Sequence, residues 1–142
     1  MPRERTNAGS MTASASQDAE IENLNEVLRE MADRGQFLSA VLASAEGLPI
    51  AAASSHEDAE ATSAMIAMLR RVSGEAKEQL ALAEVDEVSI RDSERSRLVC
   101  RCLTVSGEHL LLAVRVRPRG CYRRETNWAI RQIERLWADW QE

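Results

Sequence analysis

Three cysteines and two histidines are the most reactive side chains of this sequence, and their spacing limits what they could do. Cys100 and Cys102 are two residues apart in an apolar segment, so both thiols would lie on one face of a β-strand and could reach one metal ion. His109 and Cys121 follow, but no pair has the spacing of a zinc knuckle. We therefore expect no metal site, and we predict that the cysteines are buried free thiols.

Catalysis would require a histidine next to a nucleophile or a second acid or base. His56 lies in a segment typical of a helix start, and His109 follows a turn glycine, so both are expected at the surface. Neither histidine has a nucleophile motif such as G-x-S-x-G nearby. We predict that the chain is not an enzyme, with no catalytic residue and no cofactor.

Composition favours one globular domain. The net charge of −5 argues against nucleic acid as the main partner. No apolar run approaches the roughly 20 residues that span a bilayer, and the N-terminus has no apolar signal segment, so we expect no membrane insertion and a cytoplasmic location. Residues 1–18 lack periodicity and are predicted to be a disordered tail, and residues 19–142 a single domain.

Hydrophobic periodicity indicates the first elements that would position these side chains. A helix is predicted over 19–33, with the apolar stripe Ile21, Leu24, Leu28 and Met31. Strands are predicted over 37–43 and 48–53, joined by a tight turn at Gly47. Pro49 cannot donate a hydrogen bond to a neighbouring strand, which places the second strand at a sheet edge.

A second helix, predicted over 57–81 and capped by Ser55, is apolar on two sides. Its first stripe is Ala61, Met65, Met68/Leu69, Val72, Ala76 and Leu80. Its second stripe is Ala59, Ser63, Ile66, Ala67 and Arg70. Because the chain's own sheet can cover one side, the other side requires a partner.

Three more strands, over 84–91, 97–105 and 109–117, precede a final helix over 122–139. The predicted fold class is therefore α+β, with the order α-β-β-α-β-β-β-α. One five-stranded antiparallel sheet between two helical layers, a three-layer α/β/α sandwich, would cover every apolar stripe.

Two short motifs and the element order resemble the Roadblock family of dynein light chains, in its prokaryotic branch of small-GTPase regulators. The motifs are the hairpin Glu46-Gly47-Leu48-Pro49-Ile50-Ala51 and the strand Leu110-Leu111-Leu112-Ala113-Val114, followed by Gly120. The resemblance covers about Ile21 to Trp137 and implies the Roadblock/profilin-like sandwich.

The resemblance also implies a function. Roadblock domains are dimers with the central helix and the third strand at the interface, and they serve as scaffolds or regulators of small Ras-like GTPases. By this resemblance, the second stripe (Ala59, Ser63, Ile66, Ala67 and Arg70) becomes the homodimer or GTPase surface. The alternatives are a small-molecule-sensing module and a purely structural dimerisation module.

An arginine supplied in trans to a GTPase would be a stronger form of regulation. The candidates are Arg70 and Arg71 on the helix and Arg115, Arg117 and Arg119 near a strand end. We expect a solvated surface role for each of them, and the resemblance maps no required arginine onto these positions.

Overall fold

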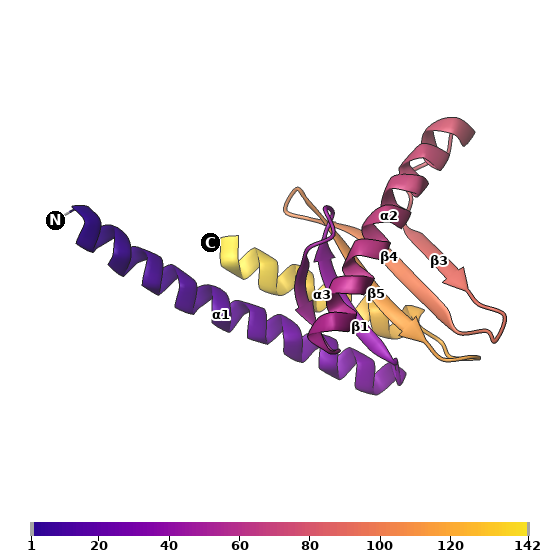
Figure 1. Cartoon of the computed structure of the whole chain (residues 1–142), viewed down its shortest axis with the longest axis horizontal. Coiled ribbons are helices and arrows are strands. Elements are labelled where there is room, and N and C mark those ends of the chain that lie inside the picture. Colours follow the sequence, from indigo (N-terminus) through magenta and orange to yellow (C-terminus); the bar gives the residue numbers. More distant parts are fainter. Residues whose placement is uncertain (1, 142) are drawn as a thin grey trace.

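The computed structural model describes residues 2–141, and its element order is the predicted one (Figure 1). Three helices and five strands follow one another as α-β-β-α-β-β-β-α. Their bounds are α1 Pro2–Gly35, β1 Ser39–Ser44, β2 Pro49–Ala52, α2 His56–Leu80, β3 Glu87–Arg91, β4 Arg97–Val105, β5 Glu108–Val116 and α3 Arg123–Gln141. Within residues 2–141, no helix is long and apolar enough to span a bilayer.

The five strands form one antiparallel sheet in the order β2-β1-β5-β4-β3. Helices α1 and α3 contact each other and cover one face of the sheet, and α2 covers the other face (Figure 1). The predicted three-layer sandwich is confirmed. Its central strand, β5, is buried on both sides, since Leu110 and Leu112 face α1 and α3 whereas Leu111 and Ala113 face α2.

Helix α1 differs from its prediction because it begins at Pro2 instead of residue 19. The segment predicted as a disordered tail is therefore helical from residue 2 to residue 18, whereas residue 1 lies outside the described residues. Once a helix is nucleated, each further residue adds a hydrogen bond, so propagation does not require an apolar face. Figure 1 shows this half of α1 projecting beyond the sheet.

The packed half of α1 uses most of the predicted stripe. Leu24, Leu28 and Met31 are fully buried against the larger core, whereas Ile21 is exposed because the helix has begun to leave the sheet there. The stripe is correct for three of its four residues.

The two edges of the sheet differ. At β2, Pro49 has no N–H to donate, and the N–H of Ala52 donates to Asn25 Oδ1 of α1 at 2.9 Å. Helix α1 therefore closes the β2 edge, which is the edge position predicted for this strand. At the opposite edge lies β3, five residues long.

Candidate partner-binding surface

The outer face of α2 carries a stripe of exposed apolar side chains, which we call the α2 stripe. Its large members keep about half or more of their surface in solvent: Met65 at 46%, Met68 at 50% and Val72 at 64%. Ala61 and Ala64 are exposed beside them. Exposed apolar patches of this kind mark interaction sites more often than isolated apolar residues do.

The α2 stripe is not the stripe that we assigned to a partner, so the two faces of the helix are reversed relative to the prediction. Ile66 and Ser63 are fully buried, and Ala59 and Ala67 are also buried, all within the chain's own fold. Ile66 contacts Ala43 and Leu111 of the sheet in the smaller core cluster. Of the five assigned residues, only Arg70 is not buried.

The close approach of the β1–β2 hairpin explains the reversal. A Cβ built on Gly47 would lie 3.0 Å from Ala67 Cβ and 3.2 Å from the Ser63 carbonyl oxygen. Small residues on the inner face allow α2 to lie this close to the hairpin, and larger Met and Val side chains would hold it away. The face with the larger apolar residues is consequently the outer one.

Strand β3 provides an open edge beside the α2 stripe. The N–H of Cys102 donates to the Asp86 carbonyl oxygen at 2.9 Å. From this point β3 and β4 pair without interruption as far as the pair Arg91–Arg97. Because hydrogen bonding alternates along an antiparallel strand, this register directs the backbone groups of Ser89 away from β4. On the α2 side of β3, Val88 is half-buried and Ile90 is exposed.

A polar network attaches the start of β3 to α3. Tyr122 Oη donates to Glu87 Oε2 at 2.6 Å, and Arg123 Nη1 lies 3.5 Å from Glu87 Oε1. The side chain of Arg101, which is buried, donates to Thr126 Oγ1 at 2.8 Å and to Asn127 Oδ1 at 2.9 Å. The bond to Glu87 raises the pKa of Tyr122. The contacts of Glu87 join the edge strand β3 to the start of α3, and those of Arg101 join the neighbouring strand β4 to the same helix.

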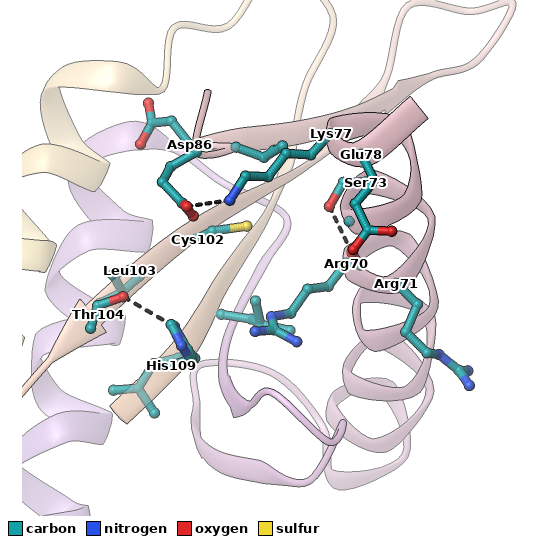
Figure 2. Close-up of a pocket in the computed structure, with 15 residues that line it drawn as sticks. Arg70, Arg71, Ser73, Lys77, Glu78, Asp86, Cys102, Leu103, Thr104 and His109 are labelled. Atoms are coloured by element: carbon teal, nitrogen blue, oxygen red, sulfur yellow. Dashed lines mark hydrogen bonds and ion pairs between the residues drawn. The ribbon is translucent and has the colours of Figure 1, made fainter. Parts of the chain in front are cut away.

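The five candidate arginines do not gather at one point. Arg115 Nη1 lies 3.4 Å from Asp58 Oδ1, and Arg117 Nε donates to the Gln36 carbonyl oxygen at 3.1 Å, while Arg119 occupies a left-handed turn conformation. Figure 2 shows Arg70 directed toward the strands and Arg71 directed away from them. Arg71 is therefore the arginine of α2 that is available to an outside partner.

A hollow of about 530 Å³ lies between the C-terminal half of α2 and strands β4 and β5 (Figure 2). Its lining includes Arg70, Cys102 and His109, and His109 Nδ1 is 3.1 Å from Thr104 Oγ1. Lys77 and Glu84 form an ion pair at its margin. Sequence reasoning gave no sign of this hollow, because the residues that form it come from separate elements.

The three cysteines are free thiols with three different environments. Cys100 is buried as predicted, Cys102 is half-buried and Cys121 is exposed, which corrects the prediction for the last two. Hydrogen bonding to Cys102 and burial raise the pKa of the Cys100 thiol, and the same hydrogen bond lowers the pKa of Cys102 to about 7. Among the side chains that the structure describes, no three His, Cys, Asp or Glu residues are arranged to hold a metal ion.

The sequence model of the Roadblock/LC7 domain matches residues 23–115. The chain belongs to the Roadblock/LC7 family. No curated protein matches it by sequence.

Solved structures of bacterial Roadblock proteins have the same fold. The gliding protein MglB of Thermus thermophilus is 18% identical, with a TM-score of 0.70 over 85% of this chain and 93% of that one. MglB of Myxococcus xanthus is 13% identical, with a TM-score of 0.71 over 84% and 90% of the two chains. A structure described as MglB with tetrameric arrangement is 20% identical, with a TM-score of 0.70 over 85% and 92%.

The match to the Roadblock/LC7 domain includes both parts of the candidate surface. It begins in the packed half of α1, contains α2 and β3, and ends within β5. The α2 stripe and the β3 edge therefore belong to the Roadblock/LC7 domain itself, and α3 lies after the matched segment.

Proposed function

We propose that this Roadblock/LC7 domain is a non-catalytic homodimer that binds a small Ras-like GTPase and regulates its nucleotide cycle or its localisation. The observation that carries the proposal is the α2 stripe beside an open sheet edge. Figure 1 places α2 and β3 on the same side of the molecule, and the two elements are in contact.

A second copy of the chain fits this surface through a two-fold axis. Two β3 strands related by such an axis run antiparallel, so their outward backbone groups can pair and extend one sheet into the other. The same axis brings the two α2 stripes together and removes Met65, Met68 and Val72 from water. The similar structure described as MglB with tetrameric arrangement supports self-association.

The GTPase partner is supported by the resemblance to regulators of small Ras-like GTPases. A small GTPase hydrolyses GTP slowly when its switch loops and the attacking water are poorly positioned. A dimer that binds the ordered switch conformation more tightly shifts the population toward it and needs no catalytic group of its own. Of the two arginines at the middle of α2, Arg71 is exposed and could contact the bound GTPase.

The experiment compares the wild-type chain with Met68→Glu in sedimentation and in retention of GTPases. We expect the wild type to sediment at twice the 15.8 kDa chain mass and to retain a Ras-like GTPase from a lysate of the cells that express it. Met68→Glu puts charges into the desolvated contact, so it should sediment as a folded monomer and retain less GTPase. Ile21→Glu, a similar change at a 39% exposed residue of α1, is the matched control and should remain dimeric.

The outcomes separate the parts of the proposal. A wild-type monomer would overturn the dimer, and retention of no Ras-like GTPase by a proven dimer would leave a purely structural module. If a GTPase is retained, its rate of GTP hydrolysis with and without the dimer decides whether it is regulated or only localised.

A further inference from the structure

We propose that Cys102 is a modification site, where its thiolate exchanges with a low-molecular-weight disulfide that enters the hollow beneath α2 and is left there as a mixed disulfide. This inference does not depend on the identity of any protein partner. It rests on the position of one thiol, on a second thiol beside it, and on the cations near both.

The hollow gives Cys102 both access and room. Figure 2 shows its sulfur directed from β4 toward α2, into the space that Arg70 enters from the opposite side. The volume of about 530 Å³ lies in the range of small-molecule sites. A disulfide of a few heavy atoms on each side can therefore approach the sulfur without unfolding the helix.

The surroundings of Cys102 stabilise its thiolate. Cys100 lies two residues earlier on the same face of β4, its buried thiol packs in the same cluster as Cys102, and the interaction between the two thiols raises the pKa of Cys100 and lowers that of Cys102. The charges of Arg70 and Arg101 further favour the thiolate, whereas Asp86 and partial burial oppose it. The other titratable groups that line the hollow are Arg71, Lys77 and Glu78 of α2, Glu84 before β3 and His109 of β5, and of these Lys77 and Glu84 neutralise each other.

The exchange needs no other reactant. The Cys102 thiolate attacks one sulfur of R–S–S–R, a new sulfur–sulfur bond forms to Cys102, and the original bond breaks. The departing R–S⁻ carries the electron pair and takes a proton from water. A thiol whose pKa is near the ambient pH is the most effective attacking group in such a reaction.

Cys100 does not remove the group again. Residues two apart in a strand have Cα atoms about 6.6–6.8 Å apart with side chains pointing the same way, at the upper limit for a disulfide. Closure would require distortion of β4, a strand paired on both sides. The mixed disulfide should therefore persist until an external thiol attacks it.

The test uses hydroxyethyl disulfide on the folded protein, with the exposed Cys121 as the reference thiol in the same chain. Peptide mass spectrometry measures the rate of modification at each cysteine as a function of pH. Although it is less exposed, Cys102 should react about threefold faster than Cys121 at pH about 6.5 and should level off above pH about 8. The proposal would be overturned if Cys102 reacts more slowly than Cys121 at every pH and if both rates rise in parallel with pH.

Two variants test whether the named groups activate the thiol. Cys100→Ala removes the neighbouring thiol, and Arg70→Gln removes a cation of α2 that lines the hollow and favours the thiolate. Each should therefore slow Cys102 about threefold at pH about 6.5 and move its rate profile to higher pH. Arg71→Gln, which changes a side chain directed away from the strands, is the matched control and should leave the profile in place. Because Arg70→Gln leaves the core intact, it remains decisive if Cys100→Ala does not fold. Equal profiles for Arg70→Gln and Arg71→Gln would contradict the proposed role of Arg70.

Discussion

Gly47 shows how one residue sets the distance between two elements. Its φ of +93° lies in the left-handed region, and its missing Cβ leaves space for Ala67 and for the backbone of Ser63. The turn was predictable because glycine adopts such a φ at little cost. The contact with α2 was not predictable, because those residues lie on a different element.

Gly47→Ala should therefore destabilise the protein more than the same substitution at a turn glycine that contacts no other element. Backbone strain costs about 1–2 kcal/mol, and the displacement of α2 adds to it. Gly107→Ala is the matched control, since Gly107 has a φ of +82° and no atom within 4 Å of a Cβ built there. Urea unfolding should give a larger loss at Gly47, and equal losses would show that the hairpin does not restrain α2.

Other single residues show where sequence reasoning succeeded and where it stopped. Ser55 was predicted to cap α2, and its Oγ accepts a hydrogen bond from the Asp58 N–H at 3.1 Å. Such a cap depends on residues three apart and is visible in the sequence. The half-buried state of Cys102 depends on α2 lying over β4, so the sequence predicted only an inert buried thiol.

At the scale of elements, all three helices and five strands were predicted in the right order. The exposed face of α2, in contrast, was predicted wrongly. Both of its faces are apolar, and hydrophobicity alone favours Met65, Met68 and Val72 for the core. The sheet beneath α2 and the nearby hairpin require small residues at close range, a packing condition that appears only when the elements are assembled.

Strand β3 carries a prediction of its own. Ser89→Pro removes an outward N–H while the hydrogen-bonded pairs with β4 remain, so the chain should fold. Loss of this hydrogen bond in both copies should weaken the dimer about tenfold or more. Analytical ultracentrifugation measures the dissociation constant, with Ser89→Ala as the control. An unchanged constant for Ser89→Pro would mean that the copies meet elsewhere.

At the scale of the whole molecule, the proposed dimer links folding to concentration. If the chain unfolds as it dissociates, each tenfold rise in chain concentration stabilises the folded dimer by about 1.4 kcal/mol. Calorimetry over a wide concentration range should therefore show a rising unfolding temperature for the wild type and a constant one for Met68→Glu. A constant temperature for both would contradict a dimer that stabilises the folded chain.

The unequal sheet edges determine how far such an assembly can grow. Because Pro49 and the Asn25–Ala52 hydrogen bond close the β2 edge, each sheet can accept a neighbouring strand only at β3. A sheet with one open edge can pair with only one other sheet, whereas a fibre would need two open edges per chain. The side chain of Asn25 contributes to this limit, because its hydrogen bond occupies an N–H of β2 that would otherwise be free to pair with another strand.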